Sequence, residues 1–366
     1  MKKFPIRVLH IVVDMNMGGI ETMLINYHRK INRKIIQFDY LVHRQERAAY
    51  DDEIEKLGGK IYCLPKLNPL SLKYRQQLSK FFKSHTEYQI VHSHINCLSA
   101  IPLKYAKKHN VPNRISHSHA NTKMKFTIKD IIKIYYRNKL TKYTTKQFAC
   151  SKEAGTWLYK DSTYSIFPNA IDAKRFIYNP KERNKIRTQL KIKNELVIGN
   201  VSSFYYIKNH SFLIDIFNEI INKGIDSKLL LIGDGQDKNH IKNKVRELNL
   251  TDKVMFLGQR SDVNNILQAF DVFLLPSLYE GLGIACIEAQ AAGLPCIISD
   301  SITKDCIITD KVYRCSLKKP ASYWAQMIID KSNVTRNNYY SLICKAGYDI
   351  VSCARDCERF YTELIK

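Results

Sequence analysis

Short apolar runs alternate with longer segments of helical periodicity along most of the chain. Runs that are apolar on both faces, with helices between them, are typical of a parallel sheet covered on both sides. In the first half we expect strands at residues 6–13, 38–42, 60–64, 89–92, 114–116 and 147–149. In the second half we expect strands at 196–201, 228–232, 253–257, 271–275 and 295–299, and helices at 210–221, 236–248, 263–270 and 284–292. The pattern predicts an α/β protein with two doubly wound, Rossmann-like domains.

A polar segment between the halves sets the expected domain boundaries. We predict a first domain at residues 1–171, a linker at 172–194, a second domain at 195–345 and a closing helical segment at 346–366, the end of a helix expected over 341–364. A chain of 366 residues is too long for one ordinary core. Ligands of doubly wound sheets bind at the carboxyl ends of the strands. The loops after the strands are therefore where we expect the chemistry.

One such loop, at residues 276–288, carries the strongest local signal. An expected strand ends at Leu275, a glycine-containing loop follows, and a helix begins, which places Glu280 on the loop and Glu288 about two turns into the helix. The free N–H groups and the dipole of a helix N-terminus suit a phosphate, and a carboxylate that accepts two vicinal hydroxyls suits a ribose. For a lone pair of glutamates, a capped helix with solvated carboxylates is the simpler interpretation.

Further motifs accompany this segment in a fixed order. They are Gly18-Gly19-Ile20-Glu21, His92-Ser93-His94, His117-Ser118-His119, Ala149-Cys150-Ser151-Lys152, Pro168-Asn169-Ala170-Ile171-Asp172, Lys208-Asn209-His210 and Leu231-Ile232-Gly233-Asp234-Gly235. Each motif alone is weak. Together they resemble retaining glycosyltransferases of family 4, particularly the branch that builds bacterial exopolysaccharide and capsule. The resemblance implies the GT-B fold, in which two Rossmann-like domains face each other across a cleft and a C-terminal helix returns to the N-terminal domain.

The resemblance also implies roles for the second-domain residues. Glu288 would bind the donor ribose, and Glu280 would contact hydroxyls of the transferred sugar. The backbone at Leu282 and Gly283 would face the diphosphate, and Lys208 would neutralise it as it leaves, the main electrostatic demand of the reaction. Taken alone, Lys208 would be a solvated lysine at a helix start.

In the first domain, Gly18 and Gly19 would let the backbone approach the donor diphosphate or the acceptor. His119 matches the family histidine beside the donor sugar, and His94 and His117 would be its neighbours on the acceptor side. The expected catalytic residues are thus Lys208, Glu280 and His119. A histidine at a strand end is more often structural than catalytic, and only the location at the sheet edge raises these three above that background.

Four positions depart from the family pattern. Ser203 stands where the family usually has an arginine that holds the diphosphate together with Lys208. Gly283 replaces a common proline, and Ala170 and Ser202 each replace a common glycine. Ser203 stays in the expected donor-binding set, but the loss of one of two cations supports an alternative in which the chain is a catalytically impaired GT-B partner in a polysaccharide assembly complex. A sugar-nucleotide epimerase is a further alternative.

The charge of the chain is uneven. Residues 1–150 hold 28 Lys and Arg against 10 Asp and Glu, and residues 122–146 alone hold eight against one. A basic stripe is expected at Lys125, Lys129, Lys133 and Arg137, with Ile128, Ile131, Ile132 and Tyr135 as an apolar face packed on the domain. Such a stripe suits an anionic membrane surface. No nucleic-acid-binding signature accompanies the charge, so no nucleic-acid partner is expected.

The remaining features bound the setting of the reaction. Arg7, His10 and Asp14 interrupt the first apolar run, no small-residue cleavage site follows it, and no run reaches the ~18 apolar residues of a membrane span. The ten cysteines form no zinc motif, and no Asp-x-Asp motif follows a strand in the first half. We expect a cytoplasmic enzyme, peripheral on the inner face of the plasma membrane. It would transfer a sugar from a UDP-linked donor to a lipid-linked oligosaccharide, without a metal or cofactor.

Overall fold

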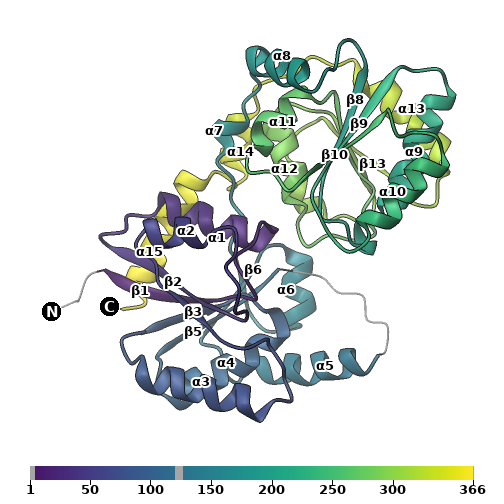
Figure 1. Ribbon diagram of the computed structural model, residues 1–366. Coiled ribbons are helices and arrows are strands. Elements are labelled where there is room, and N and C mark those ends of the chain that lie inside the picture. Colours follow the sequence, from purple (N-terminus) through teal and green to yellow (C-terminus); the bar gives the residue numbers. More distant parts are fainter. Residues whose placement is uncertain (1–4, 120–126, 366) are drawn as a thin grey trace. The chain divides into compact units, whose positions relative to one another are not determined.

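The computed structural model describes residues 5–119 and 127–365. The chain forms two compact units, the first made of residues 1–171 and 349–366, and the second of residues 172–348 (Figure 1). Each unit is a parallel sheet flanked by helices. Along the described ranges, no helix combines the length and the apolarity that crossing a bilayer requires.

The sheet of the first unit has seven parallel strands in the order β3-β2-β1-β4-β5-β6-β7. The strands are β1 (Ile6–Ile11), β2 (Ile36–Val42), β3 (Ile61–Cys63), β4 (Ile90–Ser93), β5 (Asn113–Ser118), β6 (Lys146–Ala149) and β7 (Ser165–Ile166). Strand order reverses between β1 and β4, which makes their carboxyl ends the topological switch point. The parallel register pairs His10 on β1 with His92 on β4.

Helices cover both faces of this sheet because its strands are apolar on both sides. The helices of the first unit are α1 (Gly19–Lys30), α2 (Asp51–Lys56), α3 (Leu72–Ser84), α4 (Ala100–Lys108), α5 (Ile128–Leu140), α6 (Lys152–Tyr159) and α15 (Ile350–Glu363). Val8 and Phe38 pack in one core with α1 and α15, whereas Leu9 and Leu41 pack in the other with α3 and α4. Figure 1 shows these helix groups on opposite faces of the sheet.

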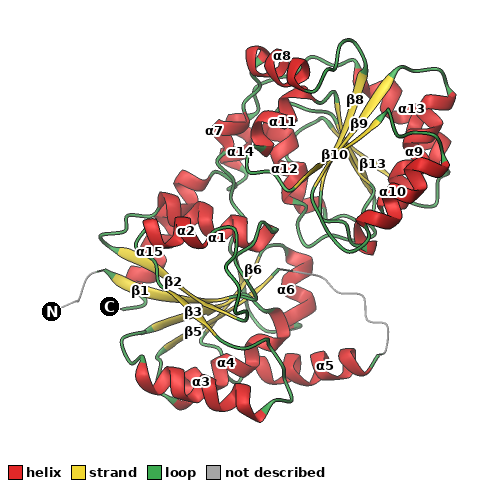
Figure 2. Cartoon of the chain, viewed as in Figure 1, coloured by secondary structure: helices red, strands yellow, loops and turns green. Residues whose placement is uncertain are grey.

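The second unit repeats the plan with six parallel strands in the order β10-β9-β8-β11-β12-β13. The strands are β8 (Leu196–Val201), β9 (Ser227–Ile232), β10 (Val254–Gly258), β11 (Val272–Leu275), β12 (Cys296–Ser299) and β13 (Val312–Cys315). Helices α9 (His210–Asn222), α10 (Lys238–Glu247) and α13 (Ala321–Ser332) lie on one face, and α11 (Val263–Ala269) and α12 (Ile284–Ala291) on the other (Figure 2). The switch point lies between β8 and β11, and the edge strand β13 is the one not expected from the sequence.

The segment predicted as a linker, 172–194, is part of the second unit instead. It forms α7 (Ala173–Phe176) and α8 (Pro180–Gln189). Arg183 and Arg187 of α8 form ion pairs with Asp271 at 2.6 and 3.3 Å. The arginines of this segment thus have partners within the second unit. Its polar composition resembles that of a linker although the segment is packed.

The last helix is interrupted. The chain forms α14 (Tyr340–Lys345) and then turns at Gly347, whose φ of +80° suits glycine. The Asp349 side chain accepts a hydrogen bond from Val351 N and caps α15. Helix α15 then buries Cys357 and Tyr361 in the core of the first unit. The expectation of one continuous helix over 341–364 is therefore wrong, whereas its return to the N-terminal domain is observed.

Candidate functional site

Two loops at the switch point of the second unit are joined by an ion pair. Lys208 lies in the loop after β8, and Glu280 in the loop after β11. Lys208 Nζ lies 2.6 Å from both carboxylate oxygens of Glu280, and Ser277 Oγ donates to Glu280 Oε1 at 2.8 Å. The backbone adds a hydrogen bond from Leu278 N to Ile207 O at 2.8 Å. The structure thus brings together two residues that the sequence places 72 positions apart.

A third loop supports the first. Gly233, after β9, has a φ of +138° and lies so close to the Ser202 carbonyl that a Cβ would collide with it. Phe204 N donates to Asp234 O at 2.9 Å, which ties the two backbones together. Ser203 sits between these anchors as a half-buried residue. Its own position is therefore set by the backbone of its neighbours.

Helix α12 begins at the expected place but with an unexpected backbone. Gly283, its N-cap, is buried and has a φ of +81°, a value that proline cannot adopt. The glycine therefore belongs with a left-handed turn, which explains why the common family proline is absent. Leu282 beside it is 3% exposed. Both residues lie at the N-terminal end of α12, as predicted.

Glu288 is half-buried further along α12. Desolvation raises its pKa to about 7, and the charge of Arg175 on α7 opposes that rise. Within the described ranges, no hydrogen bond or ion pair links Glu288 to Lys208 or Glu280. The three residues belong to one loop-and-helix assembly, and their convergence on one ligand stays a prediction.

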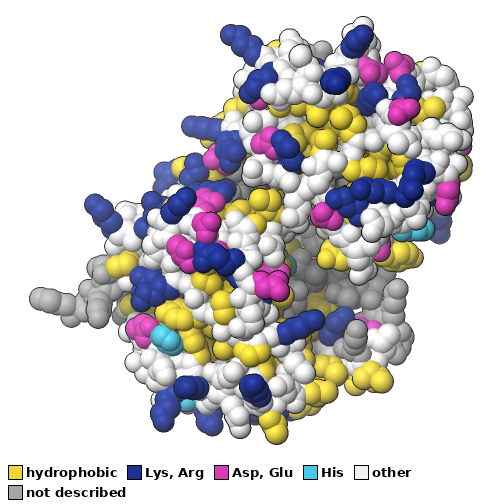
Figure 3. Space-filling view, viewed as in Figure 1, with side chains coloured by type: hydrophobic (Ala, Val, Ile, Leu, Met, Phe, Trp, Pro, Cys, Tyr) yellow, Lys and Arg dark blue, Asp and Glu magenta, His cyan; other side chains and the backbone are white. Residues whose placement is uncertain are grey.

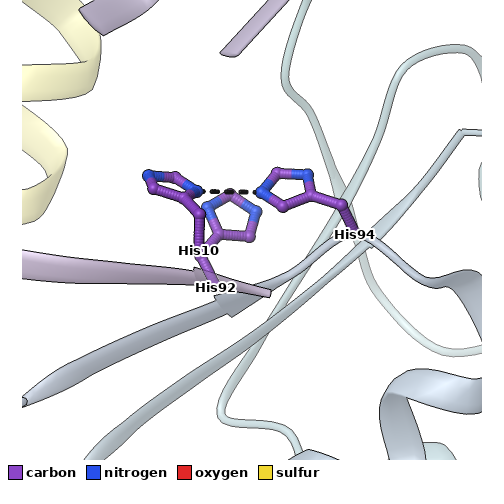
Figure 4. A group of neighbouring side chains, drawn as sticks. All are labelled: His10, His92 and His94. Carbon is purple, nitrogen blue, oxygen red and sulfur yellow. Dashed lines mark hydrogen bonds between the residues drawn. The ribbon is translucent and has the colours of Figure 1, made fainter. Parts of the chain in front are cut away.

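In the first unit, five histidines gather at the carboxyl ends of β1, β4 and β5. His10 Nδ1 lies 2.9 Å from His94 Nε2, and His94 Nδ1 lies 2.9 Å from His119 Nε2. Figure 4 shows the first of these bonds, with the His92 ring beside it. The predicted histidines His94, His117 and His119 are thus neighbours. Sequence reasoning missed His10, whose only signal was its place near the end of a strand beside the switch point.

All five imidazoles are buried, with exposed fractions from 0% for His117 to 8% for His119. Desolvation lowers the pKa of His10 and of His119 to about 3. The same cause lowers the pKa of His92, His94 and His117 well below the ordinary value. The cluster is therefore uncharged at neutral pH, and each ring offers one donor and one acceptor.

Two triads of this cluster bring ring nitrogens within 4.8 Å of one another: His10 with His92 and His94, and His94 with His117 and His119. Imidazole binds metals through a lone pair in the plane of its ring. The His92 and His94 rings are stacked 4.3 Å apart, and the His117 and His119 rings 4.0 Å apart. Stacked rings cannot aim both lone pairs at one ion, so coordination would require at least one ring of each pair to rotate.

The Gly18-Gly19 turn opens α1, with Gly18 as its N-cap. The carboxylate of Glu21 lies directly over Gly18, where a Cβ would touch it. Desolvation raises the pKa of Glu21 to about 7, and Asp14 adds to the rise. The Glu21 carboxylate therefore covers this turn, a contact that the Gly18-Gly19-Ile20-Glu21 motif did not predict.

Three of the four side chains expected to pack α5 on the domain are exposed instead, and the fourth, Ile132, is half-buried. Ile128, Ile131 and Tyr135 are 78%, 63% and 51% exposed. Arg137 instead donates to the Trp157 carbonyl at 3.1 Å, and Lys133 pairs with the buried Asp130 at 3.3 Å. Arg137 is therefore tied to α6, whereas the partner of Lys133 lies on α5 itself.

Lys125 lies outside the described residues, as does the side chain of Lys129. Membrane contact at those two positions therefore stays a prediction.

Comparisons with known proteins agree with this architecture. Residues 17–175 match the family model for Glycosyltransferase Family 4, and residues 182–327 match that for Glycosyl transferases group 1. The chain is 37% identical to the glycosyltransferase EpsF of Bacillus subtilis (strain 168), covering 88% of this chain and 86% of that protein. It is 29% identical to the capsular polysaccharide biosynthesis glycosyltransferase CapH of Staphylococcus aureus, covering 78% and 79%.

A third relative is the UDP-Gal:alpha-D-GlcNAc-diphosphoundecaprenol alpha-1,3-galactosyltransferase of Escherichia coli, 27% identical over 79% of this chain and 78% of that one. Among solved structures, Anabaena HepE in complex with UDP and glucose superposes with a TM-score of 0.82 at 16% identity, over 97% of this chain and 99% of that one. These likenesses, together with the two Rossmann-like units, establish that the chain belongs to glycosyltransferase family 4 and has the GT-B fold.

Proposed function

We propose that the protein transfers a sugar, with retention of anomeric configuration, from a UDP-sugar to a lipid-linked saccharide in exopolysaccharide or capsule synthesis. The observation that carries the proposal is the Lys208–Glu280 pair at the switch point of the second unit. A lysine at that edge, beside the start of α12, is placed where a diphosphate would need a cation. The name of CapH supports the pathway, and that of the E. coli galactosyltransferase supports the class of acceptor.

The pair has a specific consequence for donor binding. Lys208 carries three N–H donors, of which Glu280 engages at least one in the free protein. A diphosphate could take the others while Glu280 keeps the ammonium group oriented. Lys208 and the free N–H groups at the start of α12 would then stabilise the leaving diphosphate, and we propose that no divalent ion is needed.

The direct test is a transfer assay with a panel of UDP-sugars and a lipid diphosphate saccharide acceptor, run in EDTA and in added Mg²⁺ or Mn²⁺. We expect a glycosylated acceptor at the same rate in both buffers, and NMR of the new anomeric proton should show the configuration of the donor. An inverted product would contradict retention. Activity only with the ion would contradict the role of Lys208 as the sole neutralising cation.

Membrane attachment is proposed for the exposed apolar side chains of α5. Tyr136 on α5 donates to the Pro69 carbonyl at 3.2 Å, which sets the helix beside Leu70 and Leu72, both 71% exposed. Figure 3 shows hydrophobic side chains along the lower edge of the first unit, over α3 and α5. An exposed apolar patch suits the interface of a membrane, and the excess of Lys and Arg over residues 122–146 suits an anionic one. We therefore place the enzyme on the cytoplasmic face of the plasma membrane.

One observation supports the alternative in which the chain is a catalytically impaired GT-B partner. Ser203 replaces a cation expected beside the diphosphate, and this favours a chain that binds sugar nucleotides without turning them over. The same assay separates the two functions, because an impaired partner would bind UDP yet yield no product. Introducing the missing cation as Ser203→Arg would then raise turnover from background.

A further inference from the structure

The histidine cluster contains one continuous chain of hydrogen bonds. His10 on β1, His94 after β4 and His119 after β5 are joined in that order by two bonds of 2.9 Å. Backbone bonds hold the last two rings in place, since His94 N donates to Ile11 O at 2.9 Å and His119 N donates to Asn96 Oδ1 at 2.9 Å. His92 and His117 stack against the chain without extending it. This chain of hydrogen bonds spans the switch point of the first unit.

Neutral imidazoles allow this chain only two proton arrangements. Each ring carries one N–H and one lone pair, so the tautomer of one ring dictates the tautomer of the next. Either all three rings carry the proton on Nδ1, or all three carry it on Nε2. His119 at one end therefore cannot choose its tautomer independently of His10 at the other.

The two ends of the chain differ. His10 Nε2 and His119 Nδ1 are both buried with no hydrogen-bond partner among the described residues. His10 packs against Phe38 at a ring-centroid distance of 4.2 Å and is 1% exposed, whereas His119 is 8% exposed, the highest value in the cluster. A buried N–H without an acceptor is rarer in proteins than an unused acceptor. In either arrangement one end carries a buried N–H without an acceptor among the described residues. A ligand oxygen can supply that acceptor only at an end it can approach, and His119 is the more exposed of the two residues, so we infer that the N–H lies at the His119 end.

We propose that His10 and His94 are positioning residues that hold His119 in its Nδ1–H tautomer, so that His119 presents a neutral donor to an oxygen of the bound saccharide. The inference rests on the proposed sugar transfer for the nature of the ligand. Histidine alone would exchange between two neutral tautomers, and only one of them offers a donor at Nδ1. The relay removes that ambiguity before substrate arrives, which is a form of preorganisation.

The first test uses the wild-type protein and needs no activity. Long-range ¹H–¹⁵N correlation spectra of protein labelled at the histidine rings report the tautomer of each ring. We expect the Nδ1–H form for His10, His94 and His119 alike. A mixture of tautomers among the three, or a common Nε2–H form, would overturn the proposal whether or not the protein transfers sugar.

The second test asks whether His94 acts as donor and acceptor together. In His94→Ala, we expect a roughly tenfold loss of transfer rate, the value of about one hydrogen bond, and recovery with added imidazole. Pyrrole, which only donates, and thiazole, which only accepts, should fill the same cavity without recovery. Equal recovery with all three, or none in a variant that unfolds like the wild type, would mean that His94 only fills space.

His92→Ala is the matched control. His92 is as buried as His94 and stacked on it, but it is hydrogen-bonded to Tyr361 and lies outside the chain. Its removal should lower stability, and because only one nitrogen of His92 is hydrogen-bonded, a probe with a single donor or a single acceptor should fill the cavity as well as imidazole does. A preference for imidazole in His92→Ala equal to that in His94→Ala would contradict the assignment of the relay to His10, His94 and His119.

Discussion

The Tyr361 hydroxyl lies 2.6 Å from His92 Nδ1, although the two residues are 269 positions apart. Tyr361 is fully buried on α15, and His92 lies on β4 at the switch point of the first unit. The C-terminal helix therefore reaches the histidine cluster through a polar contact as well as through its apolar face. Helix α15 therefore completes the core of the first unit beside the histidine cluster.

Replacing Tyr361 by phenylalanine should expose the value of that contact. The variant keeps the ring but leaves His92 Nδ1 buried without a partner, which costs about 1–3 kcal/mol. We expect that decrease in the free energy of unfolding, measured by urea denaturation. Tyr135→Phe, at a 51% exposed position, is the control and should stay within about 0.5 kcal/mol of wild type. Equal effects of the two substitutions would contradict the account.

Glu288→Gln should separate stability from function. Burial raises the folded-state pKa of Glu288 to about 7 from 4.5, so the native state disfavours its ionisation. Its contribution to stability is present below pH 4.5 and is lost as the pH rises through 7. The glutamine variant should therefore gain stability over wild type as the pH rises, from about 1 kcal/mol at pH 5 to about 3 kcal/mol at pH 8.

The same variant should bind donor less well, because an amide cannot accept from two ribose hydroxyls as a carboxylate can. Melting curves with and without UDP across that pH range measure both effects. A constant difference in melting temperature from pH 5 to pH 8 would show that Glu288 is not held in an unfavourable charged state.

Gly283→Pro would install the common family residue at a position whose backbone excludes it. The φ of +81° differs from the proline value by more than 140°, so we expect a loss of ~3 kcal/mol or more in unfolding free energy. Gly258, with a φ of +69° and open space around it, is a control in which Gly258→Ala tests a left-handed turn outside the site. A Gly283→Pro protein as stable as wild type would show that the loop adopts another conformation.

The double variant Ile128→Ser with Ile131→Ser should weaken attachment to vesicles. Each isoleucine can bury most of an exposed side chain in the interface, so we expect at least a roughly tenfold loss in partitioning to phosphatidylglycerol vesicles, measured by co-sedimentation. Leu342→Ser removes an apolar side chain that is 39% exposed in the second unit and should change nothing. Wild-type binding that is equal on neutral and anionic vesicles would contradict the electrostatic part of the proposal.

Most strands were predictable because their residues are apolar on both faces. The orientation of α5 was not, because both its stripes could face the domain, and the choice depends on distant partners such as the Trp157 carbonyl, which accepts from Arg137. The 172–194 segment was mistaken for a linker because Arg183 pairs with Asp271, 88 positions away. Such tertiary partners leave no mark on local periodicity.

The candidate site, like the fold, was predictable only in part. Lys208 and Glu280 were predicted from the resemblance to the family, and the parallel topology that brings β8 and β11 side by side explains why the two loops meet. His10 was missed because only the register between β1 and β4 places it beside His92. Local sequence could suggest which loops carry the chemistry, but not which side chains across the sheet complete it.

Calorimetric titration with UDP tests the central claim most directly. We expect wild type to bind UDP and Lys208→Ala to bind it about 10- to 100-fold more weakly, because the variant loses a charge-assisted hydrogen bond. Lys253→Ala is the control: it removes the lysine of a more exposed ion pair, with Asp226, in the loops before β9 and β10, and it should bind like wild type. Wild-type affinity in Lys208→Ala, or no binding of UDP by wild type, would contradict the claim that Lys208 binds the donor diphosphate.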